Sequence, residues 1–236
     1  MQNFNTVLFD LDGTLLPIDI EEFLEKYFRL LTGEFSDLAS PDKLIKSLYR
    51  ATDKMLNNDG LRTNKEVFID HFFTMIDTAN KKKVMNRFSE FYSNKYPKLQ
   101  EDIEINDDAI NLVSYFKELK FQLVIATNPL FPRQAIVERI KWAGLDPDFF
   151  SFISSYENMH YAKPDLNYYR EILKNISRDP EECIMIGNDM QEDIISQKIG
   201  IKAFLVEEFL IDRDEGDITP YWRGTMGALL DYFKLT

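Results

Sequence analysis

The alternation of helical segments with short apolar runs after residue 105 constrains the fold of this chain more than any other feature. Strands are predicted for four apolar runs, at residues 121–126, 150–154, 183–186 and 203–206. Helices are predicted between them, at residues 106–120, 132–143 and 166–176, with a further helix that ends at Gly200. Such alternation indicates a parallel sheet with helices on both of its faces.

The N-terminal part of the chain has a different pattern. The apolar run Val7-Leu8-Phe9 predicts a buried strand at residues 6–10, which needs the same sheet for its burial. Residues 20–98 show helical periodicity and almost no strand signal. We therefore expect a Rossmann-like α/β core at residues 1–16 and 99–236, interrupted by an all-helical insert at residues 17–98.

The helical insert is expected to contain about four helices. Apolar residues recur at three-four spacing from Glu21 to Leu31, and Ser40-Pro41-Asp42 is typical of a helix start. A third helix is predicted to follow Asn64, and a fourth to run from Lys81 to Tyr96. Four aromatic side chains of the insert are expected in its core rather than around a substrate pocket: Phe23, Tyr27, Phe72 and Phe73.

Composition excludes several classes of protein. The net charge of −12 argues against nucleic acid as a partner, because duplex binding needs a basic surface that displaces counterions. The single cysteine, Cys183, permits no internal disulfide and lies in an apolar run, where a small core residue is expected. Neither a secretory signal nor a membrane-spanning stretch is visible, so we expect a cytoplasmic monomer or homodimer with no membrane partner.

Two carboxylates directly follow the first predicted strand, in the sequence Asp10-Leu11-Asp12-Gly13-Thr14. In open α/β sheets, ligands bind just beyond the carboxyl ends of the strands. A turn at Gly13 can hold both carboxylates near one substrate, one as a nucleophile or metal ligand and the other for proton transfer. Asp and Gly are also favoured in turns for local reasons, so this sequence alone leaves an ordinary turn open.

Polar residues also follow three other predicted strands. Each group has a local explanation: a helix cap, a solvated loop charge, or acids that complement a helix dipole. Together they would lie on one edge of one sheet, which favours a common site. The groups are Thr127-Asn128, Lys163-Pro164-Asp165, and Gly187-Asn188-Asp189 with Asp193 four residues later.

These groups, together with Asp10-Leu11-Asp12-Gly13-Thr14, resemble the four motifs of the haloacid dehalogenase-like (HAD) hydrolase superfamily. The resemblance covers the α/β part of the chain from end to end, and the helical insert is similar to the family's cap of the first type. Asn188 is a local departure, because Gly-Asp is more usual than Gly-Asn-Asp in the fourth motif. The four-residue spacing from Asp189 to Asp193 is kept, and the motif is aligned on these two residues.

Phosphoryl transfer assigns a chemical role to each of these residues. Asp10 would attack phosphorus and form an aspartyl-phosphate, and Asp12 would protonate the leaving oxygen and then activate water. Lys163 would keep Asp10 ionised and bind phosphate, for which Thr127 and the Asn128 backbone would donate hydrogen bonds. Mg²⁺ prefers hard oxygen ligands, which Asp10 and Asp189 can provide. The resemblance adds the Asp12 carbonyl, and Asp193 is expected as a ligand or as a partner of a metal-bound water.

The predicted function is therefore a Mg²⁺-dependent phosphatase acting on a small phosphorylated metabolite. A phosphomutase remains open, because it would use the same residues. A 2-haloacid dehalogenase is disfavoured by Asp12 and Asp189, since halide displacement needs neither a leaving-group acid nor a metal. A non-catalytic binding protein is disfavoured by the intact set of Asp10, Asp12, Lys163 and Asp189.

Overall fold

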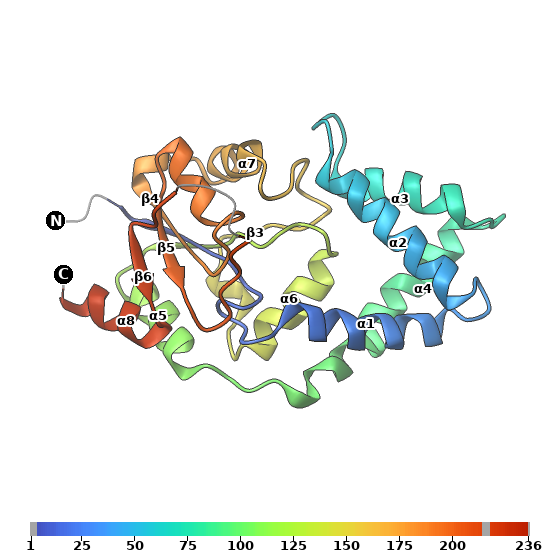
Figure 1. Cartoon of the computed structure of the whole chain (residues 1–236), viewed down its shortest axis with the longest axis horizontal. Helices are drawn as coiled ribbons and strands as arrows, with labels where there is room; N and C mark the ends of the chain where they lie inside the picture. The colour runs from blue at the N-terminus through green and yellow to red at the C-terminus, as the bar shows by residue number, and fades with distance from the viewer. Residues whose placement is uncertain (1–3, 214–217, 236) are drawn as a thin grey trace.

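The computed structural model describes residues 4–213 and 218–235. Its sheet has six parallel strands in the order β3-β2-β1-β4-β5-β6, which confirms the predicted α/β class (Figure 1). Strand β1 lies in the middle and pairs with β2 on one side and β4 on the other. The strands are β1 (Thr6–Phe9), β2 (Gln122–Ile125), β3 (Phe152–Ile153), β4 (Cys183–Gly187), β5 (Lys202–Val206) and β6 (Trp222–Gly224).

Helices cover both faces of the sheet because successive strand residues point to opposite sides. In β1, Val7 and Phe9 belong to one hydrophobic cluster and Leu8 to the other. The first cluster also contains buried residues of α5 (Asp107–Glu118), α6 (Arg133–Trp142) and α8 (Met226–Leu235). The second cluster contains buried residues of α7 (Leu166–Ile176). Cys183 of β4 is buried in the second cluster, as a small core residue.

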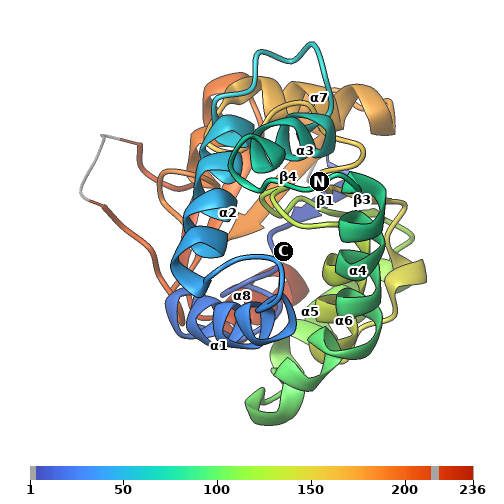
Figure 2. The ribbon, with the colours of Figure 1, turned by 90° about the vertical axis from the view of Figure 1, so that its right-hand side faces the viewer.

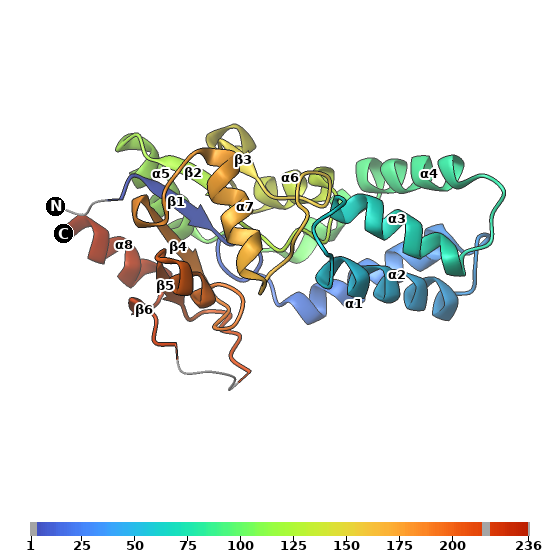
Figure 3. The ribbon, with the colours of Figure 1, turned by 90° about the horizontal axis from the view of Figure 1, so that it is seen from above.

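The helical insert contains the four predicted helices, gathered at one end of the molecule (Figures 2 and 3). Their starts follow local signals: Ser40 precedes a helix with Pro at its first position, and Thr63 and Glu66 form a capping box. A 3₁₀ helix, η1 (Tyr96–Asp102), leads back to the core. The four helices are α1 (Ile20–Glu34), α2 (Pro41–Leu56), α3 (Asn64–Met75) and α4 (Lys81–Asn94).

The structure differs from the predicted elements at several places. The segment before Gly200 is a 3₁₀ helix, η4 (Ile194–Ile199), and two short 3₁₀ turns, η2 (Pro147–Phe149) and η3 (Pro180–Glu182), were not expected. The alternation predicts no helix or strand after residue 206. In the structure, β6 forms one edge of the sheet, and α8 belongs to the helical layer on one of its faces. A three-residue strand is too short to show a period, so only its pairing with β5 reveals it.

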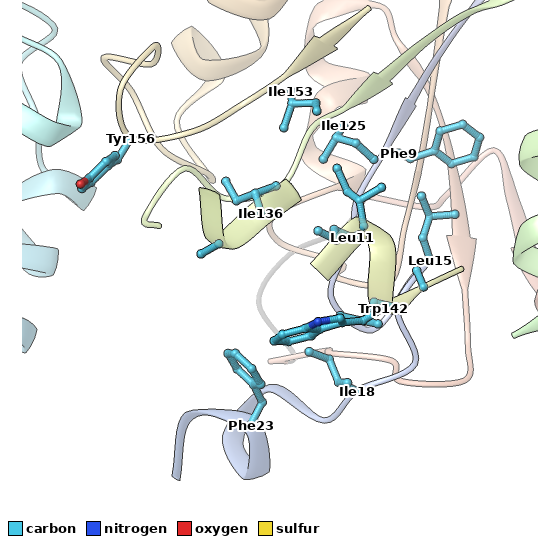
Figure 4. Close-up of a cluster of buried hydrophobic side chains, with 14 of the residues drawn as sticks. Phe9, Leu11, Leu15, Ile18, Phe23, Ile125, Ile136, Trp142, Ile153 and Tyr156 are labelled. Atoms are coloured by element: carbon cyan, nitrogen blue, oxygen red, sulfur yellow. The ribbon is translucent and has the colours of Figure 1, made fainter. Parts of the chain in front are cut away.

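The helical insert and the core share one hydrophobic cluster. Trp142 at the end of α6 lies between the Leu15 side of the core and Phe23 of α1 (Figure 4). The Trp142 ring also stacks on Tyr96 with centroids 5.1 Å apart. No helix in the described part of the chain combines the length and apolar character that a membrane span requires.

Candidate active site

Asp10 and Asp12 lie just beyond the carboxyl end of β1, the strand that pairs with β2 on one side and β4 on the other. The N–H of Asp10 still bonds the Ile186 carbonyl of β4 at 2.9 Å, and the chain then turns at Gly13, whose φ is +80°. A left-handed φ favours glycine, because other residues meet their own backbone there. Both carboxylates line one cavity at the carboxyl ends of the strands. The strand order reverses at β1, which is the position where open α/β sheets bind ligands.

Thr14 and Asn188 fix this turn. The hydroxyl oxygen of Thr14 lies 3.3 Å from Asp10 Oδ2 and 3.1 Å from Asn188 Oδ1. The Asn188 amide in turn donates to the carbonyl of Phe209. Thr14 therefore stabilises the turn, and Asn188, the departure from the usual fourth motif, connects the loop after β4 to it.

Lys163 lies at the centre of the site and is almost completely buried, with 1% of its side chain exposed. Its Nζ donates to Asp10 Oδ1 at 2.8 Å and to Asp193 Oδ1 at 2.6 Å. Burial opposes the charged form of the lysine, but Asp10 and Asp193 outweigh it and raise the pKa of Lys163 well above its ordinary value. This shift favours the charged form of Lys163 beside the predicted nucleophile.

Thr127 and Asn128 follow β2 and line the same cavity. The Thr127 carbonyl accepts hydrogen bonds from Ser154 Oγ at 2.7 Å and Tyr168 OH at 2.8 Å, which hold this loop in place. The Asn128 side chain donates to Glu192 Oε2 at 3.0 Å. Both predicted phosphate-binding residues thus line the same cavity as Asp10 and Lys163. Their loop is held in place by the hydrogen bonds from Ser154 and Tyr168.

Asp193 is buried behind the site with both carboxylate oxygens engaged. One oxygen accepts from Lys163 and the other accepts the backbone N–H of Asp189 at 3.0 Å. The carboxylate packs so closely on β4 that a Cβ at Gly187 would lie 2.1 Å from Asp193 Oδ2. This arrangement favours a positioning role for Asp193, which holds Lys163 and the Asp189 backbone.

Asp189 also lines the cavity and is buried. Its Oδ1 accepts the backbone N–H groups of Gln191 at 2.8 Å and Glu192 at 2.9 Å. The guanidinium of Arg213 pairs with both Asp189 oxygens at 2.9 Å each. Arg213 therefore offsets the charge of Asp189 and would compete with a metal ion for its oxygens.

The carboxylates of the site meet part of what Mg²⁺ requires. Among the residues that the structure describes, no three carboxylate, imidazole or thiolate side chains converge closely enough to hold a metal ion. Mg²⁺ commonly takes only one or two carboxylates together with waters and phosphate, so Asp10 and Asp189 still fit. Asp12 Oδ1 is buried without a hydrogen-bond partner, which leaves one more oxygen unsatisfied in this site. Binding at Asp189 would require Arg213 to release it.

Arg139 is a site residue that the motifs do not include. It lies on α6 with 1% of its side chain exposed, and its Nη1 donates to Asp12 Oδ2 in a very short contact. The guanidinium also lies 4.7 Å from the centroid of the Phe131 ring. Burial raises the pKa of Asp12 above its ordinary value, and Arg139 opposes that rise. Arg139 occupies a position on the apolar stripe of its helix, and a charged residue in such a stripe is the signal that could have indicated it.

Glu192 and Arg213 were also not expected in the site. Glu192 lines the cavity beside Asn128, and burial raises its pKa to about 7 even though Lys163 opposes the rise. Arg213 comes from the loop after β5, far along the chain from its partner Asp189. Glu192 lies inside the fourth motif, between Asp189 and Asp193, and its place in the sequence could have indicated it. Arg213 is 24 residues beyond Asp189, and only the folded loop brings it to the site.

The cavity extends from these polar groups into the helical insert and has a volume of about 290 Å³. It is lined on one side by the ends of β1, β2 and β4 and on the other by side chains of α1, α2, α3 and α4. Tyr27 is buried in the hydrophobic cluster and also lines this cavity. Phe23, Tyr27, Phe72 and Phe73 are all buried in the core as predicted, and Tyr27 contributes to the cavity wall in addition.

Comparison with known proteins shows the family of the chain. A model of the haloacid dehalogenase-like hydrolases matches residues 4–198. The chain is 22% identical over 202 residues to pyrophosphatase PpaX of Bacillus cereus (strain Q1), covering 86% of this chain and 82% of PpaX. It is 27% identical over 203 residues to the putative HAD-hydrolase YfnB of Bacillus subtilis (strain 168), covering 82% and 80% of the two chains.

Solved structures share the fold over the whole chain. The structure of YfnB bound to magnesium matches 99% of both chains with a TM-score of 0.57 and 21% identity. A 2-haloacid dehalogenase from Pseudomonas syringae pv. Tomato DC3000 matches 98% of this chain and 99% of its own, with a TM-score of 0.62 and 18% identity. The family match spans most of the sequence and the structural matches span nearly all of it, and this protein belongs to the haloacid dehalogenase-like hydrolases.

Proposed function

We propose that the chain is a Mg²⁺-dependent phosphatase that hydrolyses a small phosphomonoester in the cytoplasm through an aspartyl-phosphate on Asp10. The observation that carries this proposal is the contact of Asp10 with Lys163, at 2.8 Å, in a cavity that Asp12 also lines. A carboxylate nucleophile, a buried cation and a second carboxylate are the groups that phosphoryl transfer needs.

The two carboxylates divide the chemistry. An oxygen of Asp10 forms a bond to phosphorus while the bond from phosphorus to the ester oxygen breaks, and Asp12 gives its proton to the departing oxygen. Asp12 then removes a proton from water as the water attacks phosphorus, which releases phosphate and regenerates Asp10. Lys163 offsets the negative charge that collects between Asp10 and the phosphoryl oxygens. Asp10 and Asp189 would hold Mg²⁺, which would neutralise further phosphoryl charge.

Asp12 is the residue that favours a phosphatase over a 2-haloacid dehalogenase. Displacement of a halide ion needs no proton, whereas an alkoxide is a poor leaving group unless an acid protonates it. Burial raises the pKa of Asp12 although Arg139 opposes the rise, and a carboxyl with a raised pKa takes up a proton more readily than an exposed one. A phosphomutase would use the same residues. It differs from a phosphatase because it transfers the phosphoryl group to a hydroxyl of a sugar phosphate rather than to water.

The test measures inorganic phosphate released from an aryl phosphate with Mg²⁺ and with excess chelator. We expect release only with the metal, and we expect Asp10→Asn to lower kcat at least about 1,000-fold, as removal of a nucleophile does. Asp165→Asn is the matched control, because Asp165 caps α7 outside the cavity and Asn caps a helix equally well. Circular dichroism checks that both variants fold.

Four outcomes would contradict the proposal. Phosphate release that persists in chelator would exclude the metal-dependent mechanism, and substantial turnover by Asp10→Asn would exclude the nucleophile. Metal-independent halide release from a 2-haloacid, without phosphate release from any ester, would favour the dehalogenase. Phosphoryl transfer between two hydroxyls of a sugar phosphate, without net phosphate release, would favour the phosphomutase.

A further inference from the structure

The cavity that contains Asp10 has two chemically different ends. Every charged side chain that lines it comes from the core, and within the described residues the helical insert contributes none. The insert contributes aliphatic and aromatic side chains from all four of its helices instead. Six of them form what we call the apolar wall: Leu24, Phe28, Leu48, Phe68, Met85 and Phe88.

The apolar wall is not simply the interior of the insert. Leu48, Phe68 and Phe88 are nearly buried, but Leu24, Phe28 and Met85 are only half-buried although they pack against the hydrophobic cluster. Water that covers such surface is released when an apolar group replaces it, which favours binding of that group. The volume of about 290 Å³ is near the lower end of the range for small-molecule sites, about 300–1,000 Å³.

The insert end of the cavity is also lined by a few hydroxyl-bearing side chains, which are Tyr27, Tyr49, Thr52 and Tyr92. Two of these four satisfy each other. The hydroxyls of Tyr27 and Tyr92 bond each other at 2.8 Å, and burial raises the pKa of Tyr27 to about 12, so it is uncharged. A sugar or a second phosphate placed against the apolar wall would lose its hydration without finding partners, which is unfavourable. An apolar group placed there has no hydrogen bonds with water to lose.

We infer that the substrate is a phosphate monoester whose leaving group is a compact apolar or aromatic alcohol held by the apolar wall, in preference to a sugar, a carboxylate or a second phosphate. This inference rests on the proposed phosphatase and gives its substrate class. The phosphoryl group lies at Asp10 and Lys163, and the alcohol carbon skeleton extends toward α1 and α4. Leu24 becomes a specificity-determining residue.

The test compares 2-phenylethyl phosphate with glycerol 1-phosphate, glucose 6-phosphate and pyrophosphate, with Mg²⁺ present. The phenylethyl and glycerol esters are both alkyl phosphates, so leaving-group chemistry differs little between them. We expect kcat/KM for 2-phenylethyl phosphate to be at least about tenfold higher than for each of the other three compounds. An effect of this size is what a few buried methylene-sized groups produce. Equal or better use of glycerol 1-phosphate, glucose 6-phosphate or pyrophosphate would overturn the inference.

Two variants on α1 test the role of the apolar wall. Leu24→Ala is expected to raise KM for 2-phenylethyl phosphate about fivefold with little change in kcat, because the lost contact is the same in the ground and transition states. Methyl phosphate, which has nothing to reach the wall, should be unaffected. Leu30→Ala is the control, since Leu30 is also half-buried on α1 but does not line the cavity. The inference would be overturned if Leu24→Ala and Leu30→Ala changed KM equally. It would also be overturned if Leu24→Ala changed KM equally for 2-phenylethyl phosphate and methyl phosphate.

Binding of unreactive phosphonates separates this inference from the proposed function. The shift in melting temperature is measured with 2-phenylethylphosphonate and with methylphosphonate, both in saturating Mg²⁺. A larger shift for the phenylethyl compound supports the apolar wall even if no ester is hydrolysed, in which case only the proposed function fails. Hydrolysis of esters with equal shifts for both phosphonates leaves the phosphatase standing and rejects the substrate class.

Discussion

At the scale of single residues, the buried ion pair between Arg139 and Asp12 is expected to contribute to stability. Removal of one partner leaves an uncompensated charge in a site with little water, which costs about 3–5 kcal/mol in other proteins. We expect Arg139→Met and Asp12→Asn each to lower the free energy of unfolding by about 3 kcal/mol, measured by urea denaturation. Their combination should lower it by less than the sum, because the second change removes the unpaired charge.

The exposed pair of Arg62 with Asp70 provides the control, since both side chains are about half exposed (48% and 61%). Arg62→Met should change stability by no more than about 1 kcal/mol, as for other surface pairs. Additive losses in the Arg139 and Asp12 double variant would mean that the two groups do not interact in solution.

At the scale of an element, the turn after β1 depends on Gly13. A side chain at its left-handed φ of +80° is strained, and a Cβ there would lie 2.4 Å from Asn188 Nδ2. We expect Gly13→Ala to lower the free energy of unfolding by at least about 1–2 kcal/mol and to reduce kcat as well, because the turn positions Asp10 and Asp12. Urea denaturation and steady-state kinetics measure the two effects.

Gly33 near the end of α1 is the matched position for this test. A Cβ there meets no heavy atom within 4 Å, so Gly33→Ala should leave activity unchanged and stabilise the protein by up to about 1 kcal/mol. The interpretation of the turn would be wrong if Gly13→Ala were as stable as Gly33→Ala.

At the scale of the whole molecule, the helical insert and the core are joined by packing and by the backbone. One hydrophobic cluster runs through both, and the N–H groups of Asn64 and Lys65 bond the carbonyls of Met159 at 2.9 Å and Tyr156 at 2.7 Å. We expect insert and core to unfold in one transition, because neither buries its share of this cluster alone. Far-UV circular dichroism, which reports mainly on helices, and tryptophan fluorescence should show the same urea midpoint. Loss of helical signal at a clearly lower urea concentration would show that the insert unfolds independently.

Much of the fold could be predicted because its signals are local. Helix starts at Pro41 and Asn64 and the span of α7 follow from caps and apolar spacing, and the parallel sheet follows from alternation. Strand β6 was missed because three residues show no period, and η4 was given as an ordinary helix because 3₁₀ and α segments share similar composition.

The candidate site could also be predicted from the sequence only in part. The sequence by itself determined that Asp10, Asp12, Thr127, Lys163 and Asp189 follow strands, because strand ends are marked by changes of polarity along the chain, and parallel strands bring such ends to one edge. Only the tertiary structure decided that Arg139 pairs with Asp12, that Arg213 holds Asp189, and that the insert presents an apolar wall to the cavity that contains Asp10. These contacts join residues from separate elements, and their partners depend on how those elements pack rather than on any local spacing.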